Sequence, residues 1–201
     1  MAHLKIPIDA QRFANGLTWK DYLAQMGDTK ARTEANYAKA HVTDEERAFF
    51  SKMTQVRHAL MLAENWCGDV HRNSPMLARI VEAMPHCDLR VFFRDQNLDL
   101  TDCFLNNGYR SIPVIAFFDE GWNELGRWIE RPSAATVKSV GIRARTVDVA
   151  PPDQQEAAMN EFRKEVQAGY DATPSLWRDT AKEVRTVLEL RLGLAGRPTK
   201  P

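Results

Sequence analysis

Apolar positions follow a helical period at both ends of the chain. Capping-box patterns at Thr18-Trp-Lys-Asp21 and Thr43-Asp-Glu-Glu46 precede apolar residues at spacings of three and four, which predicts two helices. A third helix is expected over residues 30–40, where most apolar residues are alanines, so a surface position is expected. Near the C-terminus the pattern predicts an amphipathic helix carried by Trp177, Ala181, Val184, Leu188 and Leu192.

The central part of the chain alternates short apolar runs with helical stripes. The runs predict strands over residues 58–63, 89–93, 114–119 and 124–129. The stripes predict helices over residues 70–84, 99–106 and 133–140. This β-α-β-α-β-β-α order predicts an α/β sandwich with a mixed sheet. Pro151-Pro152 then separates it from two further helical stretches.

Composition restricts the classes of partner that we expect. Lys plus Arg and Asp plus Glu both total 27, which gives a net charge of zero, and no segment is dense in Lys or Arg. We therefore expect no nucleic-acid binding and no selection of partners by charge. The longest apolar runs are strand-sized and the first residues lack a signal-peptide core, so we expect a cytoplasmic protein with no membrane contact.

Three cysteines, Cys67, Cys87 and Cys103, are too few for a disulfide framework. Cys67 falls in the first turn of the helix after the first strand, where free amides and the helix dipole favour an anion. The position favours a lowered thiol pKa and a usable nucleophile, whereas a nearby Asp69 carboxylate would raise the pKa, and both outcomes stay open. Cys67 is thus either a reactive thiol or a residue of a fold without redox chemistry. For the other two we favour structural roles over a resolving one.

Three neighbours of Cys67 have more than one interpretation. His71 follows it by one helical turn, but no further ligands accompany the pair, so we expect no metal and no cofactor, and a surface histidine. Glu64 is expected to be exposed at the end of its strand. For Trp66, packing is favoured over flanking a substrate groove.

The segment Trp66-Cys67-Gly68 at a strand-to-helix turn resembles the active-site motif of the thioredoxin superfamily. Further matches follow in register: Pro75 to the helix-kinking proline, Ser111-Ile112-Pro113 to the cis-proline segment, and Gly126 to the glycine of the last hairpin. The resemblance implies a cis Ile112–Pro113 bond, although most X-Pro bonds are trans. It also implies that the main chain of Ile112 lies beside Cys67 and can pair with an extended substrate.

The resemblance implies a thioredoxin-like three-layer α/β/α sandwich over residues 53–142. Residues 1–52 would form an N-terminal helical extension packed on it, and residues 143–201 a C-terminal helical extension with a disordered tail. The chain is more closely similar to bacterial thioredoxin-like proteins with a Trp-Cys-Gly-Asp motif. The segments over residues 94–100 and 107–113 share that similarity.

Two departures from the thioredoxin pattern matter for function. Val70 occupies the position of the second cysteine, and Met61 that of the buried acid. The resemblance therefore implies monothiol thiol–disulfide exchange through Cys67, resolved by an external low-molecular-weight thiol or a second protein. The implied substrate groove comprises Trp66, Gly68, Asp69, Ile112 and Pro113. The alternative is a non-catalytic binding or scaffold protein, and both a monomer and a homodimer stay open.

Overall fold

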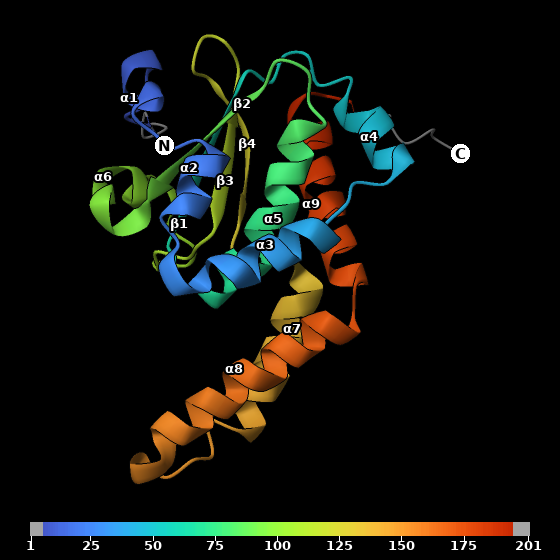
Figure 1. Cartoon of the computed structure of the whole chain (residues 1–201). Coiled ribbons are helices and arrows are strands. Elements are labelled where there is room, and N and C mark those ends of the chain that lie inside the picture. Colours follow the sequence, from blue (N-terminus) through green and yellow to red (C-terminus); the bar gives the residue numbers. More distant parts are fainter. Residues whose placement is uncertain (1–5, 195–201) are drawn as a thin grey trace.

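A four-stranded mixed sheet forms the centre of the molecule in the computed structural model, which describes residues 6–194 (Figure 1). Its strands are β1 (His58–Ala63), β2 (Asp88–Phe93), β3 (Val114–Phe118) and β4 (Glu124–Ile129), in the order β2-β1-β3-β4. β1 pairs parallel with β2 and antiparallel with β3, and β3 pairs antiparallel with β4. The mixed α/β arrangement predicted from the apolar pattern is therefore confirmed.

The described residues contain nine α-helices. They are α1 (Ala10–Ala14), α2 (Trp19–Ala24), α3 (Lys30–Lys39), α4 (Asp44–Phe50), α5 (Gly68–Glu82), α6 (Leu98–Thr101), α7 (Ser133–Arg145), α8 (Gln155–Ala172) and α9 (Ser175–Arg191). α5 begins before the first apolar residue of its stripe, and α7 continues past residue 140, where the apolar pattern had placed its end. Pro151 and Pro152 lie between α7 and α8, as predicted.

The two predicted helix starts differ in their caps. At α4 the capping box is complete, because the Thr43 hydroxyl accepts the Glu46 N–H and the Glu46 carboxylate accepts the Thr43 N–H. At α2 the Thr18 hydroxyl accepts the Asp21 N–H. The Asp21 carboxylate, however, accepts from the Thr18 hydroxyl and not from the Thr18 backbone N–H. The reciprocal half of the predicted box therefore forms only at α4.

The C-terminal helix α9 belongs to the main apolar core. Of its predicted apolar face, Trp177, Ala181, Val184 and Leu188 are at most 8% exposed, whereas Leu192 lies just past the helix and is half-buried. The helix packs on β4 beside α5. α7, which directly follows β4, packs mainly with α8, and the two project away from the sheet (Figure 1). A helix from the end of the chain thus covers the part of the sheet next to β4.

The helix over residues 30–40 lies on the surface, as predicted, since most residues of α3, Arg32 and Lys39 among them, are exposed. α3 packs against α5 and buries two polar side chains, Thr33 and Asn36, in place of an apolar face. Both bond to His71 of α5: the Thr33 hydroxyl lies 2.9 Å from Nδ1, and the Asn36 amide donates to the backbone oxygen at 2.8 Å. Hydrogen bonds to α5 hold a helix whose apolar residues are mostly alanine.

Gly126 of β4 lies directly against α9. A Cβ atom at this position would lie 2.5 Å from Cγ1 of Val187. We expect Gly126→Ala to lower the free energy of unfolding by about 1–3 kcal/mol, the usual cost of overpacking a core. Chemical denaturation followed by circular dichroism measures this.

Gly141 supplies the matched control for that substitution. It lies exposed within α7 with no atom near the position of an added Cβ. We expect Gly141→Ala to raise the free energy of unfolding by about 0.5–1 kcal/mol, because alanine favours the helix. An equal or more stable Gly126→Ala protein would contradict the close contact between β4 and α9.

Over residues 6–194, no helix combines the length and the apolar character needed to cross a membrane. The predicted disordered tail at residues 196–201 lies outside the described part of the chain.

Candidate functional site

Cys67 lies at the junction between β1 and α5, where it is the N-cap residue of the helix. Its backbone is extended, with φ −84° and ψ 123°, and its carbonyl accepts the His71 N–H at 3.2 Å. The side chain is half-buried, and its thiol lies 3.7 Å from the carbonyl oxygen of Ile112, to which it donates a hydrogen bond. The fold thus places the thiol against the segment that precedes β3.

That segment contains the one cis peptide bond of residues 6–194, between Ile112 and Pro113. Both residues are buried. The sequence by itself favoured trans, and only the resemblance implied cis. The implied contact between the main chain of Ile112 and Cys67 is present in the structure.

The pKa of Cys67 is raised, which the opposing effects of the helix start and Asp69 had left open. Burial is the largest influence and raises the pKa of the thiol above its usual value. The backbone N–H groups of Val70 and Asp69 and the charge of Arg72 lower it, and the Asp69 carboxylate raises it. The helix start therefore supplies its expected stabilisation of the anion, but loss of water outweighs it.

No second sulfur occupies the position of the thioredoxin resolving cysteine. Val70 and Met61 are both fully buried and apolar. Cys87 precedes β2 at the end of the sheet opposite Cys67, since Asp88 pairs with His58 and Phe93 with Ala63. Burial raises the pKa of Cys87 to about 12, so this thiol stays protonated near neutral pH.

Cys103 lies in a short 3-10 turn (Asp102–Phe104) after α6. Its thiol donates to the Asp99 carbonyl at 3.3 Å, and its own carbonyl accepts from Arg127 of β4 at 2.7 Å. Burial raises its pKa as well. All three cysteines are free thiols in the structure.

Glu64 is buried, at 7% exposure, which contradicts the exposure predicted for it. Its carboxylate accepts the N–H of Asp95 at 2.8 Å from the loop after β2. Burial raises the pKa of this carboxyl group. Burial raises the pKa of the Tyr22 side chain, which is fully buried in α2, and the charges of Glu64 and Cys67 add to that shift.

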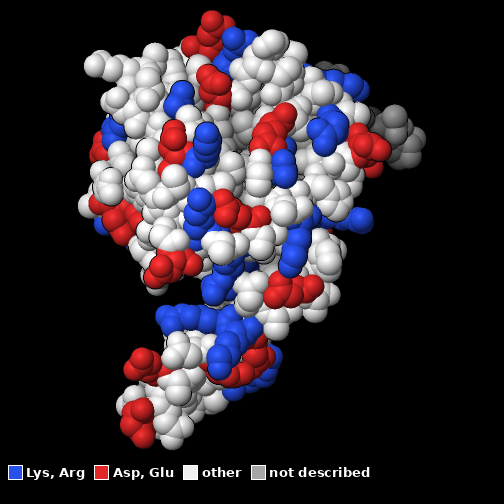
Figure 2. Space-filling view, viewed as in Figure 1, with Lys and Arg blue, Asp and Glu red and all other residues white. Residues whose placement is uncertain are grey.

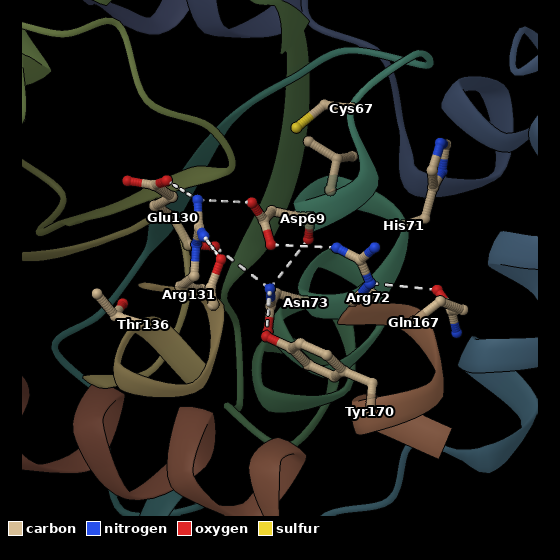
Figure 3. A network of polar contacts seen from close by, with 12 residues as sticks. Cys67, Asp69, His71, Arg72, Asn73, Glu130, Arg131, Thr136, Gln167 and Tyr170 are labelled. Carbon is tan, nitrogen blue, oxygen red and sulfur yellow. Dashed lines mark hydrogen bonds and ion pairs between the residues drawn. The ribbon is translucent and has the colours of Figure 1, made fainter. Parts of the chain in front are cut away.

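Asp69 lies between two arginines in the first turn of α5 (Figure 3). Its carboxylate is 3.3 Å from Arg72 and 2.9 Å from Arg131, which follows β4. The three side chains are 15%, 8% and 20% exposed, in the order Asp69, Arg72 and Arg131. Burial raises the Asp69 pKa, and the two arginines lower it. The acid of the Trp-Cys-Gly-Asp motif thus forms a buried ion-pair cluster that ties α5 to the end of β4.

The C-terminal helices attach to the same turn of α5. Gln167 of α8 accepts from Arg72 at 3.2 Å, and Tyr170 of α8 exchanges hydrogen bonds with the buried Asn73 at 3.3 Å (Figure 3). The Trp177 indole N–H of α9 donates to the Arg72 carbonyl at 2.6 Å. Residues about 100 positions later in the chain therefore support the turn that carries Cys67 and Asp69.

His71 is buried at 2% exposure, so its predicted surface position is wrong. Burial and the positive charges of Arg32 and Arg72 lower its pKa to about 4, which leaves the imidazole neutral at physiological pH. Within residues 6–194, no three His, Cys, Asp or Glu side chains are grouped so that they could hold a metal ion.

An open groove of about 1230 Å³ begins beside the Cys67 turn and runs between α3, α7 and α8. Trp66, Gly68 and Asp69 line it, whereas Ile112 and Pro113 lie buried at the Cys67 sulfur and do not. Of the five residues of the predicted substrate groove, three therefore line this open groove and two lie beside the Cys67 sulfur. Trp66 is 57% exposed with the Arg94 guanidinium 4.8 Å from its ring centre, so it flanks the groove and is not packed in the core.

Charge is distributed unevenly around this groove. Seven Lys or Arg side chains line it and only two acids, Asp69 and Asp171. The basic residues are Arg32, Lys39, Arg72, Arg131, Arg143, Arg163 and Lys164. The sequence-based expectation that charge plays no part in selecting partners overlooked this surface, because the residues come from separate segments that only the fold brings together.

Several residues of the site were not predicted from the sequence. Arg72 could have been found, since it lies three positions after Asp69 on the same helix. Arg131 and Tyr170 gave no local signal, because they reach Asp69 and Asn73 from other helices and loops.

Comparisons with known proteins agree with this architecture. A family model described as Thioredoxin matches residues 16–145. A solved structure of a protein of unknown function from Pseudomonas aeruginosa, PA1234, is 19% identical, with 91% of this chain and 96% of that chain covered and a TM-score of 0.64. An HIV epitope-scaffold is 17% identical, with 90% and 96% covered and a TM-score of 0.60. No curated protein matches the chain. The predicted thioredoxin-like fold with additional helices is confirmed.

Proposed function

The chain belongs to the thioredoxin family, and on that premise we propose that it carries out monothiol thiol–disulfide exchange through Cys67. One observation carries this proposal: the Cys67 thiol lies at the start of α5 and faces the Ile112 carbonyl beside the cis proline. An extended substrate segment can pair with main chain at this place and present a sulfur to Cys67.

The exchange proceeds in two balanced steps. The Cys67 thiolate attacks one sulfur of a substrate disulfide, forms a mixed disulfide, and releases the other sulfur as a thiolate. An external low-molecular-weight thiol, or a thiol of a second protein, then attacks the substrate sulfur of the mixed disulfide and releases the Cys67 thiolate. The second partner is external because Val70 stands where a dithiol protein has its resolving cysteine.

The pH dependence of Cys67 reactivity follows from its raised pKa. Since only the thiolate reacts, we expect alkylation of Cys67 by iodoacetamide to accelerate with pH and to inflect above about 8.5, the value of free cysteine. Mass spectrometry of the Cys67 peptide gives the rate, with a free cysteine peptide as the control. A plateau below the control's inflection would contradict the dominant effect of burial.

Trapping of mixed disulfides tests the exchange itself. The protein is incubated at alkaline pH with a small aromatic disulfide, and cell extract is treated separately with the protein and an alkylating quench. We expect a single adduct on Cys67 that added low-molecular-weight thiol removes, and disulfide-linked protein partners from the extract. The absence of both the adduct and the partners would refute the proposal.

A second candidate function is a non-catalytic binding or scaffold protein. The raised pKa of Cys67 favours it, together with the burial of apolar residues at positions 61 and 70. In that case every partner is retained after Cys67→Ser, whereas thiol exchange needs the sulfur. Location in the cytoplasm and the monomeric or dimeric state belong to either proposal.

A further inference from the structure

Five exposed basic side chains surround the groove from three helices: Arg32 and Lys39 of α3, Arg143 of α7, and Arg163 and Lys164 of α8. Figure 2 shows Lys and Arg gathered on both sides of the constriction between the main body and the projecting helices α7 and α8. The cations therefore face one another across a hollow and are not spread over a convex surface.

Most of this positive charge has no acidic partner nearby. Of the described residues, none forms an ion pair with Arg32, Lys39 or Arg163. Lys164 has Glu161 at 3.9 Å, and Arg143 pairs with Asp148 at 3.1 Å. Arg72 and Arg131 at the inner end already pair with Asp69. The lowered pKa of His71 beneath α3 has Arg32 and Arg72 among its causes, which is the effect expected of a positive environment. A bound anion would find these charges available.

We propose that this groove binds an acidic segment of a partner protein. Its volume of about 1230 Å³ exceeds the usual range for small-molecule pockets, about 300–1,000 Å³. Its cations are distributed along two walls, which suits carboxylates spaced along a chain. The amide nitrogen of Asn160 can donate to a peptide backbone, and Val140, 63% exposed, offers an apolar contact.

Two other anionic partners fit this surface less well. Nucleic acid gains affinity from free aromatic rings that stack on bases, but Arg94 already lies over the Trp66 ring, and Phe162 packs in the smaller apolar cluster. A membrane surface is flat, and these cations line a hollow. An acidic polypeptide is therefore the occupant that the shape and the side chains favour.

The binding is independent of thiol chemistry, since no atom of Cys67 is needed for it. The groove nevertheless includes Trp66 and Gly68, the two neighbours of Cys67 in the chain. A protein held there by an acidic segment lies next to the thiol.

Fluorescence anisotropy with a fluorescein-labelled oligoglutamate peptide tests the proposal. We expect saturable binding that weakens with salt, and a dissociation constant raised at least about tenfold by Arg163→Glu with Lys164→Glu. The matched control carries Lys52→Glu and Lys182→Glu, two exposed positions outside the groove with the same change in net charge. We expect this control to change the dissociation constant less than about twofold.

A second pair of substitutions, Arg32→Glu with Lys39→Glu on the opposite wall, repeats the test should the α8 pair lose its circular-dichroism signal. Absence of saturable binding, or equal weakening in the groove and control proteins, would overturn the proposal. So would tighter, groove-dependent binding of oligothymidylate or of phosphatidylglycerol vesicles. The Cys67→Ser protein is expected to bind oligoglutamate unchanged, which separates this result from the outcome for thiol exchange.

Discussion

Replacing Cys67 with serine is expected to abolish mixed-disulfide formation and to lower the rate of disulfide exchange by about 100-fold or more. A serine hydroxyl cannot attack a disulfide sulfur under these conditions, and Val70 offers no substitute sulfur in the motif. Exchange with a chromogenic aromatic disulfide, followed at alkaline pH, measures the loss. The fold should be retained, because the side chain is small and half-buried.

Cys103→Ser is the matched control for that experiment. Cys103 is also half-buried, but it lies in the turn after α6 with its thiol on the Asp99 carbonyl and has no part in the contact with Ile112. We expect its exchange rate to stay within about twofold of the unmodified protein. A larger loss of exchange rate in Cys103→Ser than in Cys67→Ser would show that Cys103 is the reactive cysteine, and would refute the role of Cys67.

Asp69→Ala is expected to destabilise the protein by about 3 kcal/mol or more. The change leaves the buried guanidinium of Arg72 without a carboxylate partner, while Arg131 keeps Glu130, and a buried charge that loses its partner is strongly destabilising. It also loosens the turn that carries Cys67. Urea denaturation of the full chain, monitored by tryptophan fluorescence, measures the change in free energy of unfolding.

Asp102→Ala supplies the comparison, because Asp102 pairs with Arg110 on the surface, where both side chains are nearly half exposed. We expect no measurable change in its denaturation midpoint, since water screens such pairs. Equal stability of Asp69→Ala and Asp102→Ala would contradict a structural role for the buried cluster.

Asp69→Asn separates the effect of charge from that of packing. The amide keeps the size of the side chain but removes the negative charge, one of the influences that raise the Cys67 pKa. We expect the alkylation profile of Cys67 to shift to lower pH in this variant, a change that a purely structural role would not produce. An unchanged profile would show that the Asp69 charge does not reach the thiol.

Local patterns in the sequence predict the strands and the position of Cys67 because both depend on neighbouring residues. A run such as His58–Ala63 is apolar enough to form a central strand wherever it lies, and the turn after it places Cys67 at the start of a helix. The amphipathic face of α9 is equally local, and its burial follows from its spacing of apolar residues.

Burial and long-range pairing could not be predicted in the same way. The pKa of Cys67 and the position of Glu64 depend on how much water the folded chain excludes, and the helix start alone favours the opposite direction for the thiol. The contact that holds α3 against α5 gave no signal in the apolar pattern, because Thr33 and Asn36 are polar and bond to His71, which is distant in sequence.

The sequence by itself determined that this protein has a mixed α/β sheet with one cysteine at a strand-to-helix turn and no resolving cysteine beside it. Only the tertiary structure decided that Asp69 is held between two arginines, that the last helix covers the sheet, and that a neutral chain carries a basic groove. The physical reason is the distance along the sequence over which each effect acts. Backbone geometry and apolar spacing depend on residues a few positions apart, whereas desolvation and charge depend on groups that folding brings together from distant segments.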